Sequence, residues 1–203
     1  MSESHAAIKP VFAEPTPMGL ICLAIGCAAL VPFAFGASLT PEGLRTAAMF
    51  CLFFGAGGQM LAGLLSLANH NLYGGTLFTA FAFNWLMNWW VLEQLARGVQ
   101  PDHAVILAVD ATFLVIFIAM TYGFGFYSKL LFLFLLDIVL LYAFRLANAL
   151  LGTQAFVLPI ALATLALAAI SLWIAFAMLL NPVAGRALFP LGGPMFAPRK
   201  PAA

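Results

Sequence analysis

Charged residues are scarce in this chain of 203 residues, since Lys, Arg, Asp and Glu together make up only 7% of it. A soluble domain normally carries about 25% charged residues. Here hydrophobic residues reach 65%, so too little charge is present to cover a water-facing surface, and lipid must surround most of the chain. The net charge of +1 gives no reason to expect a nucleic-acid partner.

Cysteine is also sparse, and Cys22, Cys27 and Cys51 show no spacing typical of a metal site. All three fall in apolar runs, which favours small buried side chains. The chain has no Ser/His/Asp set, no H-E-x-x-H motif and no glycine-rich phosphate loop. His70 lacks a second ligand, and we expect it to be solvated or to cap a helix. We therefore expect no metal, no cofactor and no enzymatic activity.

The hydrophobic residues form long continuous runs, without the short alternating segments of a membrane β-barrel. A backbone that crosses lipid must satisfy its own hydrogen bonds, which leaves helices for runs of this kind. The pattern predicts an all-α integral membrane protein with six transmembrane helices. Their expected bounds are 17–35, 44–67, 76–95, 104–122, 130–149 and 155–180.

This pattern divides the chain into an N-terminal tail (1–16), a six-helix transmembrane domain (17–192) and a C-terminal tail (193–203). Six crossings place both ends of the chain on one side of the membrane. More Lys and Arg residues fall on the side of the termini than on the other side, so the positive-inside rule favours cytoplasmic termini. We expect a multi-pass protein of the cell (inner) membrane, with the lipid bilayer as its surroundings.

Small residues recur at helical spacing in the second predicted helix. Gly55, Gln59 and Gly63 are spaced by four, and Gly58 and Ala62 form a second small pair beside them. Such spacing lets helix backbones approach closely, so we interpret the glycines as packing positions. Two readings of the Gln59 amide stay open, because it can face a pore or bridge two helices.

The third predicted helix places Phe81, Asn84, Trp85 and Asn88 on one face. Amides beside aromatic rings suit a narrow path that offers hydrogen bonds between apolar constrictions. The alternative is hydrogen bonding between helices or subunits, with the aromatic rings facing lipid. Residues alone leave both interpretations open.

Three ionisable residues fall within predicted helices: Asp110, Asp137 and Arg145. A charge in the membrane is expensive, so each should have a partner or contact water. Asp137 and Arg145 are about two turns apart, which allows only an indirect pairing. Asp137 could be a titrating group of a proton-linked carrier or could make a structural hydrogen bond.

Three stretches resemble the acetate uptake transporter family, also called succinate–acetate permeases. The stretch from Glu14 to Leu20, EPTPMGL, resembles the family's N-P-A-P-L-G-L signature. The stretch from Gly185 to Gly192, GRALFPLG, is similar to its G-R-x-x-L-P-L-G ending. Between them, residues resembling G-G-x-x-Q-x-x-A-G and N-T-F-G-x-T-x-F are Gly57, Gly58, Gln59, Ala62, Gly63, Asn71, Gly74, Thr76, Phe78 and Trp85.

The resemblance implies a six-helix protomer with its own pore, assembled as a homohexamer, that moves acetate and related short-chain carboxylates with protons. It implies a constriction of three side chains from the first, third and fifth helices, which by motif spacing are Leu23, Phe81 and Ile138. The expected substrate path holds Gln59, Asn71, Thr76, Asn84 and Asn88, and the possible proton-linked groups are Asp137 and Glu14.

Two departures from the family pattern bear on the substrate. Family members commonly have Phe and Tyr where this chain has Leu23 and Phe81, so a tyrosine hydroxyl is missing. Glu14 replaces the signature Asn, and a negative charge at a pore mouth repels anions. The alternatives are therefore a channel for a small neutral solute such as urea or an amide, and a non-transporting membrane scaffold or sensor.

Overall fold

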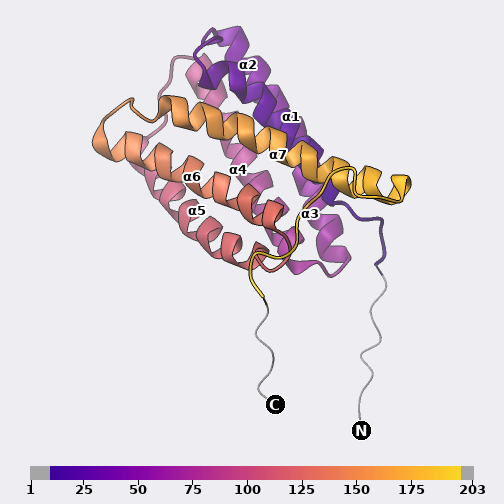
Figure 1. The fold of residues 1–203 in the computed structure, drawn as a ribbon. Helices are drawn as coiled ribbons and strands as arrows, with labels where there is room; N and C mark the ends of the chain where they lie inside the picture. The colour runs from indigo at the N-terminus through magenta and orange to yellow at the C-terminus, as the bar shows by residue number, and fades with distance from the viewer. Residues whose placement is uncertain (1–9, 198–203) are drawn as a thin grey trace.

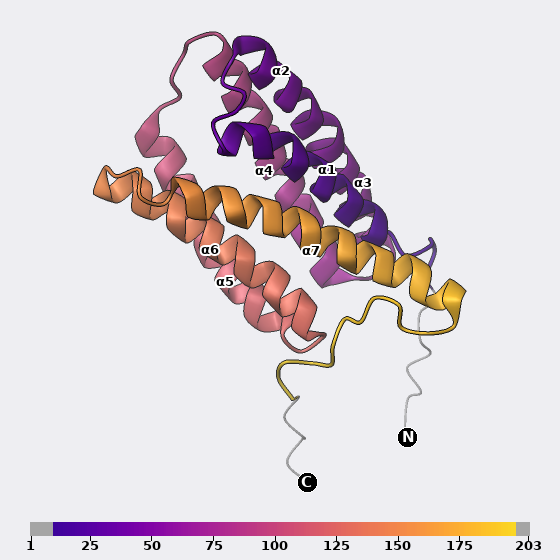
Figure 2. The ribbon, with the colours of Figure 1, turned by 45° about the horizontal axis from the view of Figure 1, so that its top comes forward.

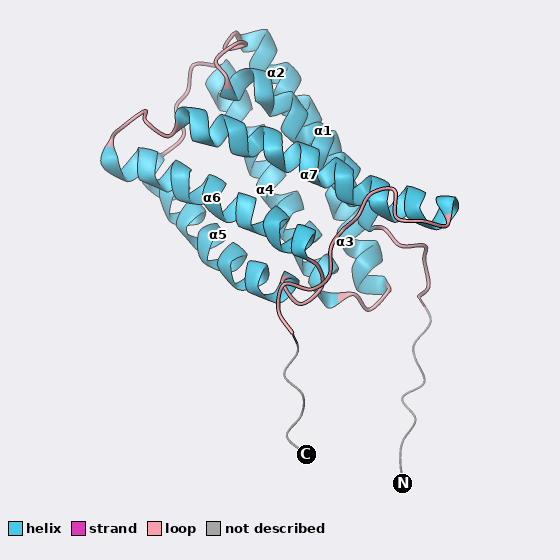
Figure 3. Cartoon of the chain, viewed as in Figure 1, coloured by secondary structure: helices cyan, strands magenta, loops and turns pink. Residues whose placement is uncertain are grey.

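The computed structural model describes residues 10–197, so residues 1–9 and 198–203 of the two predicted tails lie outside the described residues. Every regular element of the described part is a helix (Figures 1 and 3), so the fold is all-α as predicted. The elements are α1 Thr16–Ala34, α2 Pro41–Phe50, η1 Cys51–Gly58, α3 Gln59–Ala68, α4 Leu72–Ala96, α5 His103–Phe124, α6 Lys129–Leu151 and α7 Val157–Ala184.

The elements α2, η1 and α3 follow one another without a break, so the described chain contains six long helical segments. Five of these are long and apolar enough to cross a membrane: α1, the continuous segment Pro41–Ala68, α5, α6 and α7. The sixth segment, α4, has 25 residues but is not among them. It carries Asn84, Asn88 and Glu93, which lower its hydropathy.

Several helix ends differ from the expected ones by a few residues, and capping side chains set two of the helix starts. The second begins at Pro41 rather than at position 44, since Thr40 accepts a hydrogen bond from the Gly43 N–H at 3.1 Å. The third begins at Leu72 rather than at position 76, because Asn71 accepts from the Gly74 N–H at 2.9 Å. The last continues past position 180 to Ala184 and ends at Gly185, whose φ is 63°.

The sequence predicts a regular helix over 44–67, but the structure shows that this second crossing is not α-helical throughout. Its middle, Cys51–Gly58, is a π-helix of eight residues, which has wider turns than an α-helix. Gly55 and Gly58 lie in this segment, where a Cβ would meet Trp85 of α4 and Cys22 of α1 respectively. The segment thus presents bare backbone to side chains of both neighbouring helices.

Helix α7 lies between the two halves of the bundle, as Figure 2 shows. It packs against α1 on one side and against α6 on the other, and α6 packs in turn against α5. The segment α2–η1–α3 packs against both α1 and α4. The buried core draws large side chains from α1, α2, α4, α5, α6 and α7, and Leu23, Phe81, Phe117, Ile138 and Tyr142 are among them. Outer faces carry exposed apolar side chains, as lipid contact requires.

Both ends of the described chain lie at the same end of the bundle (Figure 1). The segment before α1 is held by Asn69 in the α3–α4 turn, which exchanges hydrogen bonds with the Phe12 backbone at 2.8 and 3.0 Å. The segment after α7 returns to the α5–α6 turn, where the N–H groups of Met195 and Phe196 donate to the Gly125 carbonyl. This arrangement agrees with an even number of crossings.

Candidate functional site

The three predicted constriction residues, Leu23, Phe81 and Ile138, come from α1, α4 and α6 and are all buried, with exposed fractions of 1%, 4% and 1%. They belong to one hydrophobic cluster. Helices α1 and α4 are in register, because a Cβ on Gly19 would meet the ring of Phe78 and a Cβ on Gly26 would meet that of Trp85. Leu23 therefore lies at the level of Phe81, inside the protein and away from lipid.

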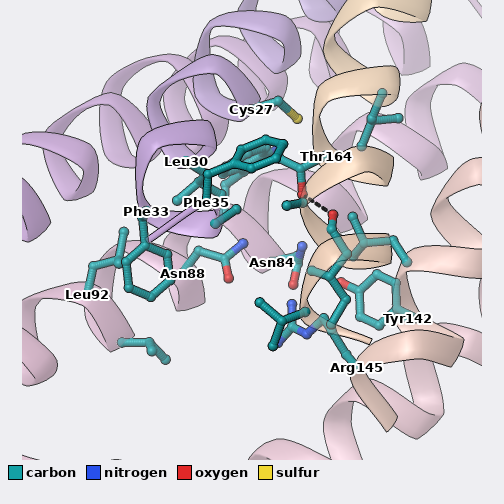
Figure 4. A pocket seen from close by; sticks show the side chains of 18 of the residues that line it. Cys27, Leu30, Phe33, Phe35, Asn84, Asn88, Leu92, Tyr142, Arg145 and Thr164 are labelled. Atoms are coloured by element: carbon teal, nitrogen blue, oxygen red, sulfur yellow. Dashed lines mark hydrogen bonds between the residues drawn. The ribbon is translucent and has the colours of Figure 1, made fainter. Parts of the chain in front are cut away.

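A cavity of about 800 Å³, the main cavity, opens between α1, α4, α6 and α7 (Figure 4). Its deepest lining residues on α1, α4 and α6 are Cys27, Phe81 and Ile138. Near the helix ends its lining includes Phe35, Leu95 and Val157, so it opens where the α1–α2, α4–α5 and α6–α7 connections lie. Leu23, one turn before Cys27, does not line it. The cavity thus ends where the predicted constriction begins.

All four residues of the predicted α4 face, Phe81, Asn84, Trp85 and Asn88, line the main cavity. Phe81 and Trp85 are buried, with exposed fractions of 4% and 3%, so these two rings do not face lipid. The two amides stand on an otherwise largely apolar lining, together with the polar groups of Tyr142, Arg145 and Thr164. The structure thus excludes lipid-facing rings for Phe81 and Trp85, and the place of this face along a substrate path stays a prediction.

Three buried polar atoms of residues in the cavity wall have no hydrogen-bond partner within residues 10–197: Nε1 of Trp85, Oδ1 of Asn84 and the hydroxyl of Tyr142. The last two lie close to each other. A buried polar atom without a partner costs about 1–3 kcal/mol. Water or a polar solute in the cavity would satisfy both. Tyr142 also brings a hydroxyl to this region one turn from Ile138, where the sequence had suggested that the constriction lacks one.

Arg145 forms an ion pair with Asp110 of α5, at 2.9 Å between Nη2 and Oδ2. Its guanidinium also lies over the ring of Tyr142, 5.4 Å from the ring centre. The sequence allowed an indirect pairing of Arg145 with Asp137. In the structure Arg145 of α6 pairs with Asp110 of α5 instead. Sequence reasoning missed it because the two residues lie on different helices, and no local spacing shows that these helices pack together.

A second cavity of about 490 Å³ lies between the start of α5 and the end of α6. Asp110, Asn148, Gln154 and His103 are among its lining residues. Arg145 and Ile160 line both cavities, whereas Asp110 lines only the second.

Gln59 is fully buried and donates from Nε2 to the Gly19 carbonyl at 3.5 Å, which links α3 to α1. Its Oε1 has no partner in the part of the chain that the structure describes. Gln59 lines neither cavity. Of the two readings of this amide, the geometry favours the bridge between helices.

The glycines of the second crossing are packing positions, which confirms their interpretation. A Cβ on Gly55 would lie 2.5 Å from Trp85, and one on Gly58 would overlap the side chain of Cys22. A Cβ on Gly63 would likewise meet Thr79. Close approach of backbones thus depends on their missing side chains.

Three predicted residues lie at the opposite end of the bundle from the mouth of the main cavity. Asn71 caps α4, Thr76 is exposed in its second turn, and the exposed Glu14 carboxylate accepts hydrogen bonds from the N–H and hydroxyl of Thr16. None of them lines either cavity. Their place in a substrate path stays a prediction.

Asp137 is half-buried on α6, and its Oδ2 has no partner among the described residues. It does not line either cavity, and its proton-linked role stays a prediction.

His70 is exposed and follows Asn69, the C-terminal capping residue of α3, so of its two expected roles the structure agrees with the solvated one. Its φ is 60°, and α3 ends with hydrogen bonds from His70 N to Leu67 O and from Asn71 N to Ser66 O. Within residues 10–197 no group of three His, Cys, Asp or Glu side chains could hold a metal ion.

The structure is similar to a solved one, that of the bacterial acetate channel SatP. The TM-score is 0.80 with 22% sequence identity, and the match covers 89% of this chain and 99% of that chain. This chain has the SatP fold. The likeness extends over nearly the whole length of both proteins, so the six long helices and their packing belong to one architecture. No protein-family model and no curated protein matches the sequence.

Proposed function

We propose that this protein is a membrane channel or proton-linked transporter for acetate and related short-chain carboxylates. Six helices, α4 included, cross the membrane, and each protomer has its own pore between α1, α4, α6 and α7. The observation that carries the proposal is the main cavity, which ends at Phe81 and Ile138 in a chain with the SatP fold. The proposal includes a homohexamer in the cell membrane with cytoplasmic termini.

The apolar constriction favours passage of a small solute that loses water easily. Leu23, Phe81 and Ile138 offer no polar atom to replace the hydration shell of a bare carboxylate, and burying such a charge costs several kcal/mol or more. We therefore propose that acetic acid passes as the neutral acid or together with a compensating proton. Asp137 and Glu14 are the candidate proton-linked groups.

The test is uptake of radiolabelled acetate by proteoliposomes across a range of external pH, with protein-free liposomes as the control for diffusion through lipid. The protein-dependent rate is expected to rise as the external pH falls toward the pKa of the acid, because the neutral fraction increases. A rate that does not change with pH would remove the neutral-acid mechanism. Absence of protein-dependent acetate flux at any pH would overturn the transport proposal and favour a scaffold.

A second candidate substrate is a neutral solute such as urea or a small amide. The observation that favours it is the pair of amides, Asn84 and Asn88, in the cavity wall, because an amide solute can both donate to and accept from them. Flux of labelled urea measured beside acetate in the same vesicles separates the two candidates.

A further inference from the structure

Most polar groups of the main cavity, apart from Thr164 of α7, lie on the wall formed by α4 and α6. Asn84, Tyr142 and Arg145 all line it there, and Figure 4 shows the three together. Arg145 has about 28% of its side chain exposed, while the Tyr142 hydroxyl and Asn84 Oδ1 are buried without partners among the described residues. This wall thus offers a cation, a hydroxyl and an amide in a cavity whose other lining is mostly apolar.

The ion pair between Arg145 and Asp110 is incomplete. Asp110 uses Oδ2, whereas its Oδ1 is buried with no partner within residues 10–197. A guanidinium has five N–H donors and can hold a carboxylate through two parallel bonds, which is the stronger arrangement. The single contact is the weaker arrangement, so a second carboxylate can replace Asp110 at the guanidinium.

From this geometry we propose that Arg145, Asn84 and Tyr142 form a binding site for the carboxylate of a short organic acid, and that Arg145 exchanges Asp110 for the solute. The inference rests on the proposed function and specifies how its substrate enters. The guanidinium binds the carboxylate, Asn84 and Tyr142 complete its hydrogen bonds, and the apolar lining receives the alkyl group. Asp110 competes for the same cation, so it keeps the site from holding its ligand too tightly.

The proposed site binds an anion, whereas the apolar constriction favours a neutral solute. The exchange at Arg145 makes the two compatible. The solute reaches the cavity wall as an anion, whose charge Arg145 compensates. It then takes up a proton from the water outside the open cavity, is released by Arg145 as the neutral acid, and passes between Phe81 and Ile138, where nothing compensates a charge. When the solute leaves, Asp110 restores the ion pair.

The experiment compares wild type with Arg145→Gln and Asp110→Asn. The first readout is the half-saturating concentration for acetate in proteoliposomes. The second is the rise in unfolding temperature that acetate produces in the purified protein, with acetamide at equal concentration as the uncharged probe. Arg145→Gln is expected to raise the half-saturating concentration about tenfold or more, as loss of a charge-assisted hydrogen bond implies.

Asp110→Asn distinguishes the proposal from a purely structural ion pair. It removes the competitor of the ligand, so acetate should half-saturate at a several-fold lower concentration and its stabilising effect should grow, while the effect of acetamide stays unchanged. A structural pair predicts a lower unfolding temperature for both variants and an unchanged response to acetate. That result would overturn the proposal.

Removal of one partner from a buried pair can prevent folding, so the double variant Arg145→Gln/Asp110→Asn serves as a second test. It carries neither charge and should respond to acetate as weakly as Arg145→Gln alone. A double variant with wild-type affinity would contradict the inference.

If wild type shows acetate-specific stabilisation without flux, the transport proposal fails while the binding site stands. If wild type shows flux that Arg145→Gln leaves unchanged, the binding site fails while the transport proposal stands.

Discussion

Gly55 in η1 lies directly against the indole ring of Trp85 in α4, so closely that a Cβ on Gly55 would be 2.5 Å from Cδ2 of the ring. The indole is 3% exposed and borders the main cavity. It is also in contact with the backbone of α1 at Gly26. Trp85 is therefore held between two glycines from different helices, and this contact positions the cavity wall.

Gly55→Ala should lower stability by about 1–3 kcal/mol, because the new methyl group overpacks a ring that cannot move aside. The measurement is the unfolding midpoint in detergent. Gly57→Ala is the matched control in the same π-helical segment, since Gly57 is exposed and the nearest atom to its Cβ would lie 3.5 Å away. Equal losses in both variants would show that the π-helix rather than the indole contact is sensitive.

Ile138→Ala should widen the path at the base of the main cavity. We expect flux of larger carboxylates such as butyrate to rise several-fold relative to acetate, together with a loss of about 2–5 kcal/mol in stability. The ratio of butyrate to acetate flux in proteoliposomes measures the change. Leu140→Ala on the same helix is the control, because Leu140 is 43% exposed and its truncation leaves the cavity intact. An unchanged ratio in Ile138→Ala argues against a constriction here.

His70→Gly should stabilise the protein by about 1 kcal/mol, because a residue with a Cβ is strained at a φ of 60° and glycine is not. His70→Ala is the control, since it removes the imidazole and keeps the strain. A higher unfolding midpoint for the glycine variant alone is the expected result. If the alanine variant gains as much, the imidazole rather than the backbone is the cause.

Asn69→Ala should release the segment before α1, because it removes both hydrogen bonds to the Phe12 backbone. Hydrogen exchange at Phe12 is expected to accelerate by about fivefold or more, in keeping with about 1 kcal/mol per hydrogen bond. Asn71→Ala is the control, since it removes the cap of α4 and leaves the Phe12 contact in place. Exchange at Phe12 that stays slow in Asn69→Ala would mean that other contacts hold this segment.

Hydrophobic runs and turn residues were enough to predict six helical segments. The helical period was enough to predict a common face for Phe81, Asn84, Trp85 and Asn88. Both patterns depend only on residues that are close together in the sequence. Capping shifted two of the helix starts, since a single hydrogen bond that the side chain of Thr40 or Asn71 accepts decides where the first turn begins. The expected packing role of Gly55, Gly58 and Gly63 also followed from spacing alone.

The tertiary structure alone decided which helices are neighbours, and the candidate site depends on that. The Asp110–Arg145 pair and the Tyr142 hydroxyl beside Asn84 both require α4, α5 and α6 to be placed relative to one another. A helix pattern shows which face is buried but not against which partner, because many pairings bury the same apolar stripe. The sequence by itself determined the crossings and their faces, and packing in three dimensions determined the cavity between them.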